Sequence, residues 1–464
     1  MKYFVLLLVT AVCFIISILV VKKPVFNISM IKYKGRSIKV ESFWLASLMI
    51  PAILLAVGAI SPLEIIRGVT SVQSMNPIKI LVLFMSMCFI SVMLDKAGFF
   101  EYCALKVMSR PEKGQLYLFV VFYVVVAVLT VFTSNDIIIL TFTPFIYYFA
   151  KNAGINPVPY IIAEFVAANT WSLVLIIGNP TNIYIASSMG ITFIEYLKVM
   201  ALPGVTAGLS SFFMLMFIFR RQLKMPLKES CLNECIAKKP VLKDKTMALI
   251  SLTNLALCMI ALTLGSYMDI QMWLVSLSFA VLLLIAALLV QVYRKYRGIK
   301  TAESDEQHFV SIKNVFKGLP FSLIPFLLSM FVAVLALEKY GITDSFSRAL
   351  FSVTDSSLDA VLLFGFTSAL CSNVVNNIPM SILFTSILTD GGLNSYSPLA
   401  IYSTIIGSNI GAFFSPIGAL AGVMLMKILK DKGDSFSALS FIRYCAPIAV
   451  VSLVASVLVL IPVL

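Results

Sequence analysis

The sequence predicts an all-α integral membrane protein with about ten transmembrane helices and two re-entrant hairpins, arranged as two inverted-topology repeats. Three observations predict this fold. Apolar runs of nearly 20 residues recur in a chain that is 60% hydrophobic and 12% charged, with a mean hydropathy of +0.99, and a run of that length crosses a bilayer as one helix. Lys and Arg cluster in a few loops between the runs. Similar polar motifs occur in both halves of the chain.

The first spans are expected at 3–21, 43–60 and 78–94. The loop between the first two carries six basic residues against Glu41, so the positive-inside rule places it in the cytoplasm and the N-terminus outside. Residues 61–77 are then outside and 95–114 inside. Within the inner loop, Leu94–Leu105 is too short and too charged to span, which predicts a helix along the membrane surface.

Next come two apolar arms, 115–132 and 137–150, of which the second is short for a full crossing. Their junction carries Ser134, Asn135 and Asp136. We therefore expect a re-entrant hairpin over 115–150 that dips from the cytoplasm and has these three residues at its tip.

The segment 160–187 is long enough to cross, but it has Asn, Ser, Gly and Pro residues in its middle. Non-helical backbone at that depth is tolerated only where it is buried in protein or lines a wet cavity. We expect a broken helix in which Gly178 and Pro180 supply the interruption, because glycine permits close backbone approach and proline removes a helix hydrogen bond. A span at 203–220 completes a first repeat, 1–221.

A strongly basic segment, 222–246, is the expected cytoplasmic linker between the repeats. The second repeat, 247–464, begins with paired spans at 247–264 and 272–292. Its remaining elements are a span at 320–337, a hairpin at 358–390, a broken helix at 397–426 interrupted by Gly411, Pro416 and Gly418, and a last span at 445–462 that ends outside.

Corresponding positions in the two halves keep a nearly constant spacing, which indicates an internal duplication. Asp95 aligns with Glu338, Asn135 with Asn373, and Asn169 with Asn409. The surface stretch of the first half is net basic, whereas its counterpart in the second half is net acidic. This charge difference places the two stretches on opposite sides of the membrane, so the repeats are predicted to be inverted.

Paired Gly/Pro-interrupted segments in two halves predict a solute site near the membrane midplane. Amides and hydroxyls there can bind a small hydroxylated solute or ion, although such residues also serve as interhelical contacts. The carboxyl groups of Asp136 and Glu164 are candidates to bind a coupling proton or sodium ion; helix capping is the alternative for Asp136, and a partly hydrated helix end for Glu164. The uncharged candidates are Ser134, Asn135, Asn169, Thr170, Ser172, Asn179, Thr181, Ser372, Asn373, Asn376, Asn377, Ser408, Asn409 and Ser415.

Other classes of function lack their signatures in this sequence. The polar motifs contain no Lys or Arg, which argues against a multiply charged anion as solute. They also lack a nucleophile with its base, so an enzyme is not expected. Cys231 and Cys235 have no further ligand at zinc-site spacing, so no structural metal is expected. The net charge of +13 follows the positive-inside pattern and does not indicate nucleic-acid binding.

The chain resembles the arsenite-efflux permease (ArsB) family of the ion transporter superfamily. The resemblance rests on Leu94–Leu105, Ser134–Pro144, 160–185, Val375–Pro379 and the run from Ile406 to Ala421. It implies hairpins from opposite faces that meet two broken helices, and it allows a separate cytoplasmic ATPase as partner, since the chain has no Walker A motif.

From these patterns we expect a secondary active transporter in a bacterial or archaeal plasma membrane, with both termini outside. It would export arsenite or a related metalloid by alternating access, driven by the proton motive force. The alternatives are a sodium/proton antiporter and a cation-coupled carboxylate carrier of the citrate type. No cofactor is expected beyond a coupling H⁺ or Na⁺, the partners are membrane lipid and a small ion, and no feature of the sequence specifies an oligomeric state.

Overall fold

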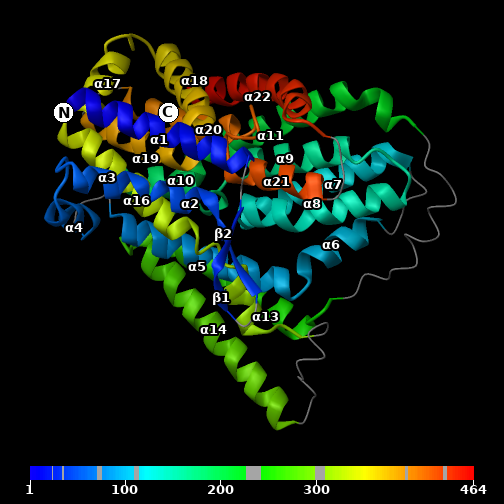
Figure 1. The fold of residues 1–464 in the computed structure, drawn as a ribbon. Coiled ribbons are helices and arrows are strands. Elements are labelled where there is room, and N and C mark those ends of the chain that lie inside the picture. The colour runs from blue at the N-terminus through cyan, green and yellow to red at the C-terminus, as the bar shows by residue number, and fades with distance from the viewer. Residues whose placement is uncertain are drawn as a thin grey trace.

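The computed structural model describes residues 1–22, 25–33, 36–70, 76–108, 114–225, 242–297, 309–391, 396–431 and 436–464 (Figure 1). Within these ranges, eight helices are long and apolar enough to cross a membrane. The expected helical membrane fold is confirmed. Most of the predicted linker 222–246, with Cys231 and Cys235, lies outside the described residues.

The N-terminal region differs from the all-α expectation by one small sheet. Strands β1 (Val25–Tyr33) and β2 (Arg36–Glu41) pair antiparallel, with Phe26 opposite Val40 and Ile28 opposite Ile38. Apolar residues alternate with polar ones in Phe26–Ser29, which is a strand pattern that charge counting overlooks. In the sequence, the sheet is preceded by α1 (Lys2–Lys22) and followed by α2 (Ser42–Ser47) and α3 (Met49–Ala56), the last two replacing a single expected span.

The same order of elements occurs twice in the rest of the chain. The first set comprises α4 (Pro62–Thr70), α5 (Pro77–Lys96), α6 (Phe99–Met108), α7 (Gly114–Phe132), α8 (Asn135–Asn152), α9 (Val158–Trp171), the 3₁₀ turn η2 (Ile176–Gly178), α10 (Pro180–Ser188) and α11 (Phe193–Leu223). The second comprises α15 (Ile312–Gly318), α16 (Leu323–Lys339), α17 (Ile342–Phe351), α18 (Ser357–Val375), α19 (Asn377–Asp390), α20 (Ser397–Gly411), α21 (Leu420–Asp431) and α22 (Ala438–Leu460). The long pair α13 (Lys245–Tyr267) and α14 (Met272–Tyr296) separates them.

The corresponding helices α5 and α16 run antiparallel. Gly318, just before α16, lies against Val92 and Lys96 at the end of α5. At the opposite end, Gly68, just before α5, lies against Phe331 and Leu335 near the end of α16. This direction is the one that inverted repeats require. In Figure 1, α7 and α8 lie on the right of the molecule, and α17 and α19 on the left.

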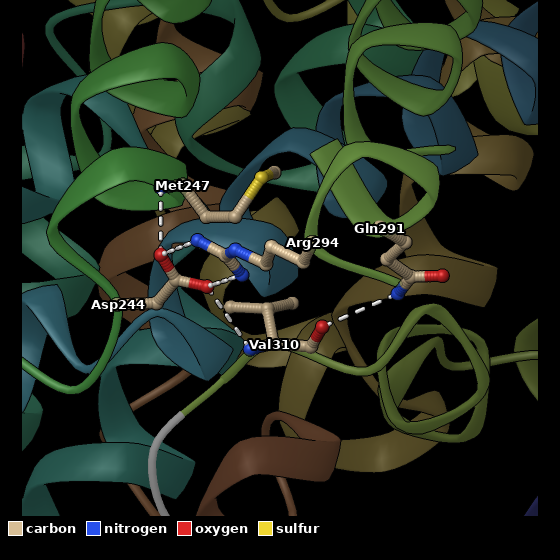
Figure 2. A network of polar contacts seen from close by, with 5 residues as sticks. All are labelled: Asp244, Met247, Gln291, Arg294 and Val310. Carbon is tan, nitrogen blue, oxygen red and sulfur yellow. Dashed lines mark hydrogen bonds and ion pairs between the residues drawn. The ribbon is translucent and has the colours of Figure 1, made fainter. Parts of the chain in front are cut away.

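A buried ion pair joins several segments at one end of the molecule (Figure 2). Arg294 of α14 donates two hydrogen bonds, 2.7 and 2.8 Å long, to the carboxylate of Asp244, which also accepts the backbone N–H groups of Met247 and Val310. The N–H of Asp244 in turn donates to the carbonyl of Ala97, between α5 and α6. This ion pair and its backbone hydrogen bonds therefore connect the start of α13, the end of α14 and the segment before α15 to the first set of helices.

The same contacts hold Asp244 in its ionised form. Burial alone opposes ionisation, but the hydrogen bonds from Arg294 and the two backbone N–H groups, together with the Arg294 charge, outweigh it, and the pKa of Asp244 lies below its usual value. Lys243 beside it pairs with Glu101 of α6 at 2.8 Å. We call this end, which the sequence predicts to be cytoplasmic, the inner end, and the opposite one the outer end.

Helices from the two sets pack closely against each other in the core. The Ser456 hydroxyl of α22 donates to the carbonyl of Pro203 in α11 at 2.9 Å. Within the second set, Gly407 of α20 lies so close to the Gly365 carbonyl of α18 that a Cβ at 407 would come within 2.2 Å of it. Small residues permit this approach, as is common between membrane helices.

Candidate functional site

The first interruption separates α9 from α10. Asn179 caps α10 by accepting the N–H of Thr181 at 3.1 Å, and Pro180 is the first residue of that helix, where a missing N–H costs no hydrogen bond. A Cβ at Gly178 would come within 2.4 Å of the Ser172 carbonyl oxygen. Pro180 therefore starts the second half-helix, and Gly178 permits the tight return of the chain that separates it from the first.

The second interruption separates α20 from α21, over residues 412–419. Gly418 lies against the carbonyl of Gly411, where a Cβ would come within 2.7 Å. The hairpin of α18 and α19 holds this segment by its backbone: the N–H of Asn377 donates to the Gly418 carbonyl at 3.0 Å, and the Asn376 amide donates to the Ile417 carbonyl at 3.2 Å.

Asn409, near the end of α20, is the centre of a cluster that connects the two interruptions. Its Oδ1 accepts hydrogen bonds from the Ser172 hydroxyl at 3.1 Å and the Asn179 amide at 2.8 Å. Its Nδ2 donates to Asn182 Oδ1 at 2.6 Å and to the Ile405 carbonyl at 2.9 Å. The side-chain amide of Asn409 thus uses both of its acceptor and both of its donor positions.

Two more contacts complete this amide cluster, which consists of Ser172, Asn179, Thr181, Asn182, Ser408 and Asn409. The Ser408 hydroxyl donates to Thr181 Oγ1 at 2.9 Å, and the Asn182 amide donates to the Ser172 carbonyl at 2.8 Å. Each of the six side chains is at most 1% exposed. The cluster is therefore closed to both sides of the molecule in this conformation.

The tip of each hairpin reaches the broken helix of its own set. The Asn135 amide donates to Asn169 Oδ1 at 3.2 Å, about one turn before the break. In the second set, the Asn373 amide donates to the Gly411 carbonyl at 2.9 Å and its Oδ1 accepts from the Ser415 hydroxyl at 2.6 Å. Each tip thus fixes the end of a half-helix.

The alignment of Asn135 with Asn373 is wrong. Asn135 begins α8, and the residue that begins α19 is Asn377; Asn373 lies in the last turn of α18. The turn of the second hairpin is at Asn376, which has a positive φ of 76° and caps α19. The second tip carries three Asn residues, so residue type alone did not identify which of them begins the helix.

The two candidate carboxylates differ in their surroundings. Asp136 is half-buried in the first turn of α8, and its carboxylate has no hydrogen bond or ion pair among the described residues. It does not cap α8. Glu164 of α9 is 1% exposed; Oε2 accepts the Thr143 hydroxyl of α8 at 3.0 Å, and Oε1 has no partner among the described residues.

Some predicted site residues are satisfied within their own helices. The Thr170 hydroxyl donates to the Val166 carbonyl, and the Ser372 hydroxyl to that of Ser368. The Ser134 hydroxyl is buried without a partner among the described residues.

The sequence analysis missed Asn182 and Thr143. Asn182 could have been found because it lies one helical turn after Asn179, whose side chain was selected, so the two share a face. For Thr143 the pattern of the sequence contains no comparable signal, because its role depends on the packing of α8 against α9.

Sequence comparison places this arrangement among known transporters. The model for the ArsB family, arsenical pump membrane protein, matches residues 51–463. An arsenical pump membrane protein of Escherichia coli is 28% identical over 356 residues, which are 75% of this chain and 78% of the relative. One from Yersinia enterocolitica is 28% identical over 361 residues, covering 76% and 79%. An uncharacterised transporter of Mycobacterium tuberculosis is 24% identical over 388 residues, covering 81% and 84%.

Two solved structures share the fold. The MtrF protein of Neisseria gonorrhoeae, described as one of a class of antimetabolite efflux pumps, aligns with a TM-score of 0.54 and 11% identity, over 98% of this chain and 93% of that one. The YdaH transporter of Alcanivorax borkumensis aligns with a TM-score of 0.56 and 14% identity, over 98% and 97%. At these identities the likeness concerns the fold alone.

Proposed function

The chain belongs to the arsenical pump membrane protein (ArsB) family of membrane transporters, and on this basis we propose that it exports arsenite, or a related small metalloid hydroxide, in exchange for protons. The observation that carries the proposal is the buried amide cluster around Asn409, which both interrupted helices help to build. The chain acts as an integral membrane protein of the bacterial plasma membrane, with its inner end in the cytoplasm.

The chemistry of the amide cluster suits a neutral hydroxylated solute. Its six side chains are amides and hydroxyls, without a charged group among them. The hydroxyl groups of arsenous acid both donate and accept hydrogen bonds, as amides and hydroxyls do. A solute that enters between Asn179 and Asn409 would replace contacts of the same kind, so the polar groups stay paired when it binds and when it leaves.

The position of the cluster supports alternating access. Its contacts run from the first interruption to the end of α20, so they join half-helices of the two sets. Breaking them toward one side would open the solute site to that side only. In such a cycle, a cluster closed to both sides would be the occluded step.

Coupling is assigned to the two carboxylates of the first set. An unpaired charge is costly at membrane depth, so a carboxylate there has to bind a proton or a cation. Asp136 lies at the hairpin tip, next to Asn135, which contacts the broken helix. Glu164 joins α8 to α9 through Thr143. Protonation of either group alters the contact between hairpin and broken helix, which links proton binding to movement.

The proton motive force is sufficient to drive export. One charge that crosses a potential of 100 mV contributes ~2.3 kcal/mol, which corresponds to a roughly fiftyfold gradient of solute. The transporter then works without nucleotide hydrolysis, and a separate cytoplasmic ATPase would be an additional source of energy.

Everted membrane vesicles with an imposed pH gradient test the proposal. Addition of arsenite is expected to dissipate the gradient, and arsenite is expected to accumulate uphill. The Asp136→Asn variant is expected to lose this coupling, whereas Asp344→Asn, at an exposed acid paired with Arg348, is the matched control and keeps it.

Three results would contradict the proposal. Dissipation by sodium in place of arsenite would make the chain a sodium/proton antiporter. Movement of arsenite only down its own gradient would make it a channel. Undiminished coupling in Asp136→Asn would remove this residue from the coupling step.

A further inference from the structure

A half-buried carboxylate lies at the outer end, outside the solute site. Glu338 is in the last turn of α16 and lies beside Ser386 of α19. It also interacts electrostatically with Asp390 of α19 and with Tyr184 of α10. Three helices thus bring two carboxylates and two hydroxyls together.

One hydroxyl of this group is unusual because it is unpaired. Tyr184 is 3% exposed, yet its hydroxyl has no hydrogen-bond partner among the described residues; the Ser386 hydroxyl is fully buried and lies against the Glu338 carboxylate. Buried polar groups in proteins are nearly always paired. An unpaired buried hydroxyl near a carboxylate therefore points to a ligand that comes and goes.

The helix that carries Tyr184 also lines a cavity at the outer end. The cavity has a volume of about 340 Å³, and its lining includes Lys79, Gln271 and Ser187. Ser187 lies on α10 one turn after Tyr184, so the two side chains share a face of the helix. The Ser187 hydroxyl is also buried without a partner among the described residues. Hydroxyls that both donate and accept hydrogen bonds can pass a proton along this face.

The corresponding position of the first set carries a carboxylate beside a hydroxyl at the inner end. Asp95 is the penultimate residue of α5, as Glu338 is of α16. Its Oδ1 accepts the Thr141 hydroxyl of α8 at 3.0 Å, and it lines a cavity of about 360 Å³. Asp95 differs from Glu338 in being paired with Lys96 at 2.9 Å. Because α5 and α16 are antiparallel, the two carboxylates lie at opposite ends of the molecule.

The charged groups around Glu338 leave it without a cationic partner. Among the described residues, no basic side chain forms an ion pair with Glu338 or Asp390; Lys339 is paired with Glu64, and Arg348 with Asp344. The charged side chains that the structure describes on the helices packed against α16 are Lys2, Glu64, Arg67, Lys79, Asp95, Lys96, Asp344, Arg348 and Asp390.

We propose that Glu338 takes up the coupling proton from the outer side, through Ser187 and Tyr184, and that Asp390 tunes this uptake. The step forms an O–H bond at the Glu338 carboxylate with a proton delivered from water in the cavity, and the same bond breaks when the proton moves inward. The inference rests on the proposed proton coupling, and it adds an entry site at a position distinct from Asp136 and Glu164.

Transport in vesicles of controlled sidedness tests the proposal. Wild-type exchange is expected to slow as the pH on the outer side is raised. Glu338→Gln is expected to lose this dependence and to lower the exchange rate by about tenfold or more, Tyr184→Phe to show a smaller decrease, and Asp344→Asn to behave as wild type. A wild-type protein without proton coupling would overturn the proposed function, whereas a coupled wild type with an unchanged Glu338→Gln profile overturns only this inference.

Chemical modification gives a second readout that does not depend on transport. A hydrophobic carbodiimide reacts with protonated, buried carboxyl groups, and mass spectrometry of the purified protein locates the modified residue. We expect modification at Glu338 that decreases as the pH rises, and a different pH profile in Asp390→Asn because the neighbouring negative charge is removed. Glu338 that stays unmodified at every pH would overturn the proposal, and pH-independent protection by sodium would reassign the site to that cation.

Discussion

The two interrupted helices are held open in different ways. At the first, polar side chains of Ser172, Asn179 and Asn182 bind across to Asn409 of the other set. At the second, the backbone carbonyls of Ile417 and Gly418 bind to the hairpin of the same set. The first interruption therefore makes its polar contacts with the other set, whereas the second is fixed by the hairpin of its own set.

The two sets also differ in their carboxylates. The counterpart of Asp136 in the helix that begins at Asn377 is Ile378, and the counterpart of Glu164 is Thr404. The Thr404 hydroxyl returns to the Ala400 carbonyl of its own helix, whereas Glu164 reaches across to α8. The comparison teaches that two similarly interrupted sets can differ in side-chain chemistry: at these two pairs of positions, only the first set has carboxylates.

The largest effect is expected from Asn409→Ala. It removes the shared partner of three side chains of the first interruption, and each buried polar group left unpaired costs about 1–3 kcal/mol. A loss of about 3 kcal/mol corresponds to a roughly hundredfold decrease in solute affinity. Binding of arsenite to purified protein measures it, with Thr170→Val as control because that hydroxyl lies outside the amide cluster and donates to the Val166 carbonyl of its own helix. Equal binding in both variants would remove the amide cluster from the solute site.

The next largest effect is expected from Glu164→Gln, compared with Thr404→Val at the corresponding position. Glutamine preserves the contact with Thr143 but cannot carry the proton, so uphill accumulation of roughly fiftyfold at 100 mV is expected to fall to equilibration. Thr404→Val is expected to keep accumulation. A loss of coupling in both variants would mean that the two sets share this task.

An intermediate effect is expected from Gly178→Ala, where the added methyl group meets the Ser172 carbonyl. Overpacking of this kind costs about 1–3 kcal/mol, and it displaces a residue of the amide cluster. Gly418→Ala should destabilise the protein by a similar amount with less effect on binding. Thermal unfolding and arsenite binding separate the two, with Gly265→Ala as control, since its Cβ would meet its neighbours at 3.5 Å or more.

The smallest effect is expected from Ser415→Ala in the second interruption. It removes one hydrogen bond to Asn373, worth about 0.5–1.5 kcal/mol, while the backbone bonds from Asn376 and Asn377 remain. Transport is expected to stay within about tenfold of wild type. A loss as large as that of Asn409→Ala would show that the second interruption also contacts the solute.

Hydropathy and the placement of polar residues predicted most of this architecture. A run such as Gly178–Asn182 inside an apolar segment cannot continue as a regular helix, so the first interruption could be predicted from the sequence. The small sheet was not predicted, because the basic residues of this segment were interpreted only as a charged loop. The register of the second hairpin tip depends on which of three Asn residues takes a positive φ, and the electrostatic interaction of Glu338 with Tyr184 joins helices distant in the chain. Such choices are decided by packing.

The helix α5 reaches both cavities, one through Leu83 and the other through Asp95. Twelve helical steps of about 1.5 Å separate these points, which is roughly 18 Å, whereas the hydrocarbon core of a bilayer is ~30 Å thick. Water in the two cavities would confine the drop in electrical potential to this shorter distance. An ion moving beside α5 would then experience a steeper field than the lipid alone imposes, so much of the available voltage acts where the protein moves its charge.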